Sequence, residues 1–339
     1  MKISSQLLLI AGALSHAPLA GAHSLGQSVA VYSDNQGLTR RNFETSMTAD
    51  VRPELSRLTS GLLSLKLSRD IAKDAVALSE DDYYRTHYGE EGVVTQNAAL
   101  GFQASIARLT ELSLAGSVAA DQATSSQTLS IGAGQWLFHE SLLASVELAQ
   151  ATLKRPELEL LGPNSDLIVP PQRRSKLGAT LRLKHLATPT TIVQYTATQA
   201  RSNDRPDLSA YGVGLRQYLR PVNAAWHASV TRVFNRGEVD FRTDYGPIDA
   251  TIVETALLKE LSAATSARIG YRWFREDETQ KVTGTEVTRG SDTLSLKVAH
   301  RVARWTLELG QAYYLTNEIY QTSEKRRGTM FEGGVRAIL

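Results

Sequence analysis

One polar stretch gathers the side chains best suited to bind a ligand. In residues 79–92, SEDDYYRTHYGEEG, five carboxylates flank three tyrosines and one histidine. Carboxylate oxygens could bind a divalent cation, and the tyrosine rings could stack on a sugar. The spacing is not that of a calcium loop, so a solvated surface loop is the other interpretation. The candidate ligand residues are Glu80, Asp81, Asp82, Tyr84, His87 and Tyr88.

Nucleophilic hydrolysis would need a histidine paired with a serine or a carboxylate. Of the histidines that follow His23, only His87 lies in a long polar segment, beside acids and Thr86. The sequence contains neither a G-x-S-x-G nor an H-E-x-x-H motif. We therefore expect no catalytic residue, no metal and no cofactor, and a membrane-bound hydrolase is the least favoured hypothesis.

The composition excludes several functional classes. Cysteine is absent, which removes disulfides, thiolate metal sites and a catalytic or lipid-modified cysteine. The net charge is only +2, and no dense Lys/Arg segment is interleaved with aromatics, so nucleic-acid binding is not expected. Beyond the N-terminus, no window approaches the roughly 18 apolar residues of a spanning helix. Strands that cross a membrane escape this test, because only alternate residues face lipid.

The N-terminus has the pattern of a secretory signal peptide. Lys2 precedes an apolar run at residues 7–14, and Ala20-Gly21-Ala22 fits a small-x-small cleavage site. We predict a signal peptide over residues 1–22 and one domain over residues 23–339. A short buried helix is the alternative interpretation of the same residues.

The elements that must position any site are alternating segments. In SARIGYRWFRED, residues 266–277, Ala267, Ile269, Tyr271 and Trp273 alternate with polar residues that include two arginines. A helix of period 3.6 would mix these two sets, whereas a strand separates them. Sixteen segments are predicted as strands: 27–32, 43–54, 61–69, 94–107, 112–120, 126–138, 142–153, 175–186, 190–200, 209–219, 224–235, 250–261, 265–276, 291–302, 305–314 and 329–339.

The connectors between these segments alternate in length. Short ones, such as 139–141 and 303–304, take turns with longer polar ones, such as 70–93 and 154–174. That alternation is typical of an up-and-down antiparallel barrel with short turns at one rim and long loops at the other. We predict an all-β transmembrane barrel of about 16 strands, with 14–16 plausible. A secreted β-sandwich or solenoid is the alternative.

Aromatic residues near the predicted strand ends support the membrane interpretation. Membrane barrels collect tryptophan and tyrosine at the two lipid–water interfaces. Trp136, Trp226 and Trp305 lie at the short-turn ends, and Trp273 and Tyr313 lie at the long-loop ends. We predict that all five are interface aromatics.

The last strand carries a further signal. Its sequence EGGVRAIL places Glu332, Gly334, Ala337 and Leu339 at the spacing polar-x-Gly-x-x-apolar-x-apolar. In this the chain resembles bacterial outer-membrane β-barrel proteins, and it is porin-like in size and strand count. The resemblance implies an outer-membrane location, contact with outer-membrane lipid and delivery by the barrel-assembly machinery.

A barrel of about sixteen strands is too wide for side chains to fill, so an aqueous lumen remains. The predicted lumen-lining charges are Arg182, Lys184, Arg216, Arg268, Arg272, Lys297, Arg301, Arg336, Glu254 and Glu308. A ladder of basic residues can favour anions, but these charges could equally pair with one another. The expected function is porin-like passage of small hydrophilic solutes. The alternative is a non-conducting receptor or a scaffold for a periplasmic partner, and a homo-oligomer is possible in either case.

Overall fold

The computed structural model describes most of the chain. The described residues are 23–34, 39–51, 54–56, 59–75, 93–106, 109–120, 125–155, 158–161, 166–169, 172–202, 207–235, 248–279, 286–318 and 325–338. The predicted signal peptide and the candidate ligand residues Glu80, Asp81, Asp82, Tyr84, His87 and Tyr88 lie outside these ranges.

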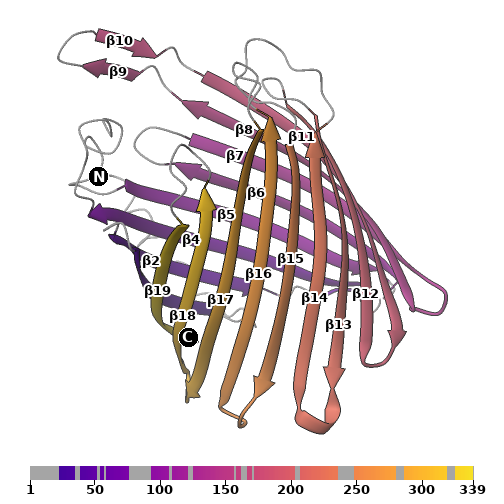
Figure 1. Cartoon of the computed structure of the whole chain (residues 1–339). Helices are drawn as coiled ribbons and strands as arrows, with labels where there is room; N and C mark the ends of the chain where they lie inside the picture. The colour runs from indigo at the N-terminus through magenta and orange to yellow at the C-terminus, as the bar shows by residue number, and fades with distance from the viewer. Residues whose placement is uncertain are drawn as a thin grey trace.

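Sixteen antiparallel strands form a closed barrel, as predicted (Figure 1). Each strand pairs with the next, and β1 pairs with both β2 and β19, which closes the sheet. The strands of the barrel wall are β1 (His23–Asp34), β2 (Thr39–Val51), β4 (Thr59–Ala75), β5 (Val93–Ile106), β6 (Thr110–Ala120), β7 (Ser125–Leu137), β8 (Leu142–Arg155), β11 (Gln172–Thr188), β12 (Thr191–Ser202), β13 (Leu208–Leu219), β14 (Ala224–Asn235), β15 (Ile248–Glu260), β16 (Thr265–Thr279), β17 (Glu286–Val302), β18 (Trp305–Glu318) and β19 (Lys325–Ile338).

Every predicted strand corresponds to one strand of the wall. Predicted and observed bounds coincide for β14, and most differences lie at the long-loop ends, where the strands continue further than predicted. Thus β16 runs to Thr279 and β17 begins at Glu286, so Asp277 lies in a strand rather than in a loop. Beyond the lipid boundary both faces of a strand meet water, so pairing continues after the apolar alternation has ended.

The structure adds elements that the sequence pattern did not reveal. β9 (Leu158–Leu161) and β10 (Asp166–Val169) form a hairpin within the predicted 154–174 loop, and they extend away from the rim beside β8 and β11 (Figure 1). The short β3 (Glu54–Ser56) pairs with β4, and one 3-10 turn, η1 (Arg220–Val222), joins β13 to β14. Within the described ranges no helix is long and apolar enough to span a membrane.

The two faces of the wall differ in chemistry. Large apolar side chains that are highly exposed within the strands, such as Leu309 at 70%, Ile131 at 58% and Leu177 at 58%, all lie on one face by strand register. The other face is concave, because Lys297 on β17 reaches Glu332 on β19 across the intervening strand β18. Side chains on a convex surface would diverge instead of meeting. The apolar face is therefore the convex one, and it suits lipid rather than water.

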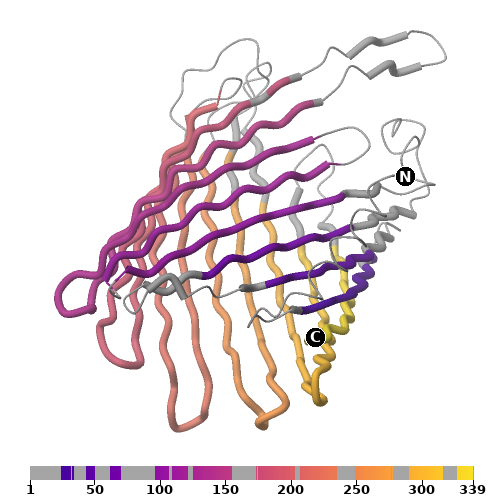
Figure 2. Tube along the Cα trace, turned by 180° about the vertical axis from the view of Figure 1, so that it is seen from behind, coloured from indigo at the N-terminus to yellow at the C-terminus, as the bar shows by residue number. Residues whose placement is uncertain are grey.

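The concave face itself has two unlike walls, which lie opposite each other in the barrel (Figures 1 and 2). On β5 to β7 it carries mostly small and hydroxyl residues, such as Ser113, Gly132 and Gly134. A Cβ added to Gly132 would lie 2.5 Å from the Ser113 Oγ, so a side chain there would require the serine hydroxyl to move. The charged residues concentrate on the wall formed by β14 to β19.

The face assignment predicts opposite outcomes for neighbouring residues. Val230 lies mid-strand on the convex face and is 50% exposed, whereas Ser229 faces the lumen opposite Glu254. We expect Val230→Arg to lower the free energy of unfolding by about 2–4 kcal/mol, because it places a charge in lipid. Ser229→Arg should change it by no more than about 0.5 kcal/mol. Urea titration of the protein refolded in lipid vesicles measures both, and equal losses would contradict the assignment.

Candidate functional site

The lumen wall of β14 to β19 brings charged side chains into register. Arg272 on β16 lies directly opposite Glu254 on β15, and Arg268 lies directly opposite Lys297 on β17. Register places all ten predicted lumen charges on this concave face: Arg182, Lys184, Arg216, Glu254, Arg268, Arg272, Lys297, Arg301, Glu308 and Arg336. Their role in the lumen stays a prediction.

A network of ion pairs spans three adjacent strands. The Lys297 ammonium lies 2.8 Å from a Glu308 carboxylate oxygen and 3.3 Å from one of Glu332. Arg336 on β19 donates to the other oxygen of Glu308 at 2.8 Å. Gly310 lies opposite both Lys297 and Glu332, and a side chain there would collide with Glu332. The glycine therefore leaves the space through which the lysine crosses β18.

Two further pairs lie outside this network. Arg272 reaches Glu254 at 3.3 Å, and Arg182 reaches Glu147 at 2.7 Å across β8 and β11. The side chains of Arg272 and Glu254 remain 55% and 48% exposed, so water reaches them inside the barrel. Pairs that are this well solvated contribute little to stability. They do neutralise part of the basic charge that the sequence pattern predicted for the lumen.

Some lumen cations have no carboxylate partner within the described residues. Arg216 and Arg268 form no ion pair there, and Arg301 donates to the backbone oxygen of Ala303 at 3.3 Å. The Lys184 ammonium lies 5.7 Å from the centre of the Trp136 ring, a cation–π geometry. No carboxylate of the described residues therefore neutralises these four cations.

A recess of about 400 Å³ lies in the charged wall. Its floor is formed by small residues on four successive strands, because Ala256, Gly270, Ser295 and Ala312 lie in one row of the register. Charged residues border the floor: Arg268, Arg272, Lys297, Glu254 and Glu332. A small polar solute that entered the recess would meet both signs of charge, with the unpaired Arg268 as the free cation.

Four of the five predicted interface aromatics lie on the convex face, namely Trp226, Trp273, Trp305 and Tyr313. The Trp226 indole donates to the Thr255 hydroxyl at 2.9 Å, and Trp305 stacks under Arg304. The structure also brings two aromatic rings of neighbouring strands into contact. The Tyr211 and Phe234 rings stack at 5.7 Å near the long-loop end of β13 and β14.

Trp136 is an exception and corrects the prediction. It shares the concave face with Gly132 and Gly134, and its indole nitrogen donates to Glu111 at 2.8 Å. Together with the nearby Lys184, these contacts hold the ring at the short-turn end of the lumen. The aromatic residue type alone does not tell which face it occupies, because buried or half-buried tryptophan also seeks a hydrogen-bond acceptor.

The histidines and carboxylates of the described residues do not gather into a metal centre. No group of three or more His, Asp or Glu side chains comes close enough there to hold a metal ion. His227 lines the recess in the lumen, whereas His300 lies on the convex face and bonds to Thr265 at 2.8 Å. The predicted candidate His87 lies outside the described residues.

The fold matches known outer-membrane barrels although the sequence does not match known families. No protein-family model matches the chain, and no curated protein sequence matches it significantly. CdiB from Acinetobacter baumannii has a TM-score of 0.58 at 9% identity, over 92% of this chain and 60% of that chain. The anion-selective porin from Comamonas acidovorans gives 0.53 at 9% identity, over 95% and 99% of the two chains. OccK5 (OpdH) from Pseudomonas aeruginosa gives 0.52 at 8% identity, over 94% and 98%.

These similarities establish the fold. The resemblance to outer-membrane β-barrels, porin-like in strand count, is confirmed, and no specific family follows from it. The chain spans 60% of the length of CdiB but nearly the whole length of the two other proteins. Both of those proteins are about as long as this chain, and the match covers nearly all of each, which agrees with a barrel that makes up most of this chain.

A wet lumen predicts weak coupling between Arg272 and Glu254. We expect the cycle of Arg272→Met, Glu254→Gln and the double variant to give a coupling of about 0.2–1 kcal/mol. The side chains of Lys297 and Glu308 are less exposed, so their coupling free energy should be larger than that of Arg272 and Glu254 in the same urea titrations. A coupling above about 3 kcal/mol for Arg272 and Glu254 would indicate a buried pair and contradict a water-filled lumen.

Proposed function

We propose that the protein is an outer-membrane channel for the passive passage of small hydrophilic solutes. The observation that carries the proposal is the solvent exposure of the lumen charges. Arg272 is 55% exposed and Arg336 is 54% exposed, although both lie on the inner face of a closed barrel. Side chains packed against a plug would be buried. The apolar convex face and the similar solved structures support the outer-membrane location.

Two unlike walls would guide a solute through this channel. The wall of β5 to β7 offers small side chains and hydroxyl groups, and the wall of β14 to β19 offers charged groups. A polar solute exchanges its water for these groups without entering an apolar region, so its transfer costs little free energy. No conformational change and no energy source are needed for movement of this kind.

The lumen charges favour anions modestly. Among the concave-face residues whose side chains the structure describes, ten are basic and seven are acidic: Lys66, Lys176, Arg182, Lys184, Arg216, Arg268, Arg272, Lys297, Arg301 and Arg336, against Glu44, Glu111, Glu147, Glu254, Glu260, Glu308 and Glu332. Ion pairs leave this excess of positive charge unchanged, but they neutralise several of the basic side chains locally. We therefore propose a weak anion preference that depends mostly on unpaired residues such as Arg268.

Planar-bilayer recording tests the channel directly. The purified, refolded protein should give stepwise current increases in a potassium chloride solution as single barrels insert. Protease resistance and the β-sheet circular dichroism spectrum of the same sample show that the barrel is folded. Silence from folded, inserted protein would refute the channel and favour the receptor or scaffold function instead.

Reversing one charge in the recess should change ion selectivity. We expect Arg268→Glu to lower the chloride-to-potassium permeability ratio by about twofold or more, because a cation in the lumen becomes an anion. The reversal potential under a salt gradient measures this ratio. Lys259→Glu is the matched control, since Lys259 lies on the convex face at the short-turn end and should leave the ratio unchanged. An equal shift in both variants would contradict a role for the lumen.

A further inference from the structure

Charge on the convex face is concentrated at one end of the barrel. Near the long-loop ends of the strands it carries Arg69, Lys154, Arg173, Arg201, Arg232, Arg275 and Arg327. On the short-turn half of that face, the described strand residues include a single Lys, Arg, Asp or Glu, which is Lys259. We call the seven basic residues at the long-loop end the basic girdle.

Part of the basic girdle follows a single row of the sheet. Pairing between neighbouring strands connects Arg69 on β4 through Gln96, Ala120 and Ser125 to Lys154 on β8 and Arg173 on β11. Arg69 and Lys154 have no carboxylate partner within the described residues, and both are exposed. The positive charge therefore runs around the barrel instead of forming one local patch.

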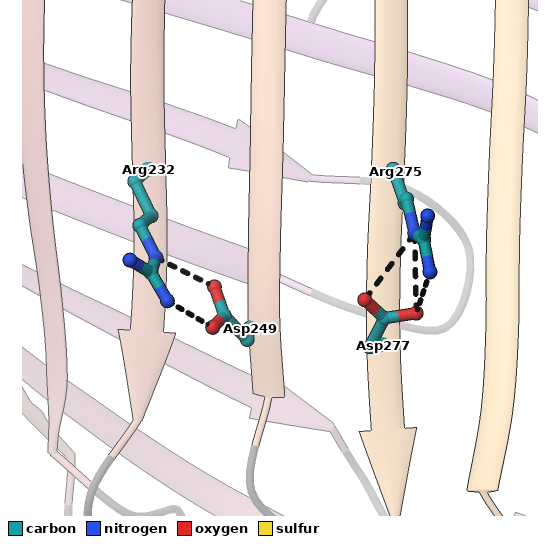
Figure 3. Close-up of polar contacts among 4 residues, drawn as sticks. All are labelled: Arg232, Asp249, Arg275 and Asp277. Atoms are coloured by element: carbon teal, nitrogen blue, oxygen red, sulfur yellow. Dashed lines mark hydrogen bonds and ion pairs between the residues drawn. The ribbon is translucent and has the colours of Figure 1, made fainter.

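On the other side of the barrel the girdle includes acidic residues. Arg232 on β14 binds both carboxylate oxygens of Asp249 on β15, through Nε at 2.9 Å and through Nη2 (Figure 3). Arg275 binds Asp277 two residues further along β16, at 3.3 Å. Asp249 and Asp277 lie opposite each other in register, so the arginines flank a pair of carboxylates.

These ion pairs do not use up the arginines. A guanidinium has five N–H donors, and the contacts with Asp249 occupy only the Nε and Nη2 groups of Arg232. The side chain remains 63% exposed, and that of Arg201, which pairs with Asp207, is 74% exposed. Among the residues whose side chains the structure describes, the seven basic ones also exceed the four acids at this end of the convex face, which are Asp207, Asp249, Asp277 and Asp292.

The girdle lies at the depth of lipid headgroups. Arg232 is opposite Tyr211 in register, and Arg275 is two residues beyond Trp273 on the same face. Aromatic side chains of membrane proteins collect at the interface between hydrocarbon and headgroups. The arginines are thus level with the headgroups or just outside them, where a lipid phosphate would lie.

We propose that the basic girdle binds the phosphate groups of lipids in the leaflet that surrounds the long-loop rim. Arginine suits this role because its planar fork donates two parallel hydrogen bonds to a phosphate. The encircling arrangement fits a ring of lipids better than it fits a single protein partner. The proposal rests on the membrane location argued above, and it does not depend on conduction.

Binding of a phosphorylated glycolipid tests the proposal. The probe is fluorescently labelled lipid A with two phosphates, and the comparison is the same glycolipid without phosphate. The whole protein in zwitterionic detergent micelles should bind the phosphorylated probe at least about tenfold more tightly, because several cations act near one headgroup layer. Added salt should weaken that preference. Equal affinity for both probes would overturn the proposal.

Two variants that each remove four positive charges show which face of the barrel binds the glycolipid. The variant with Arg69→Gln, Lys154→Gln, Arg232→Gln and Arg275→Gln should lose the preference for phosphate. The control replaces four lumen residues, Lys176, Lys184, Arg216 and Arg268, by glutamine and should keep it, although both variants lose equal charge. Retention of the preference by the first variant, or equal loss in the control, would overturn the proposal. Circular dichroism and protease resistance confirm that each variant is folded. A barrel that binds the phosphorylated glycolipid but conducts no ions would refute the proposed channel and leave the lipid-binding proposal standing.

Discussion

The structure depends on one constraint, which is that every backbone hydrogen bond within lipid must be made inside the protein. No water is available there to satisfy a free N–H or C=O group, so an open sheet edge would be costly. Pairing of β1 with β19 removes both edges of the sheet. Once the sheet is closed, each strand must present one face outward and the other inward. The alternation of apolar and polar residues follows from that requirement.

The same closure allows charges that a protein core would reject. A lumen of this width holds water, so Arg272 and Glu254 remain about half exposed while they pair. Lys297 instead bridges two carboxylates in a more crowded part of the wall, where Gly310 provides the space. The lumen therefore contains both loosely hydrated pairs and a tighter network. Only a few cations, Arg268 among them, keep an unbalanced charge that a solute could meet.

The sequence was sufficient for the fold and for the face on which each lumen charge lies. Strict period-two alternation determines the face, so Arg268 and Arg272 could be placed before any register was known. Their partners could not be predicted, because Lys297 meets Glu332 only through the offset between β17, β18 and β19. Trp136 was misplaced because the prediction rested on its residue type and its position near a strand end, although its alternation with Gly132 and Gly134 already indicates the concave face. The β9–β10 hairpin was missed, although GPNS between the apolar runs LELL and DLIV is a turn signal.

The pairing of Ser24 with Ile338 has a consequence for the order of events during folding. The contact joins the two ends of the described chain, so it has a very large sequence separation and a high entropic cost of formation. Every hairpin of the barrel can form locally, but the facing edges of β1 and β19 can pair only when the two ends of the described chain meet. An incomplete sheet with two such edges would readily pair with other chains. Folding of this protein is therefore expected to be slow and sensitive to concentration, with its rate set by closure rather than by strand formation.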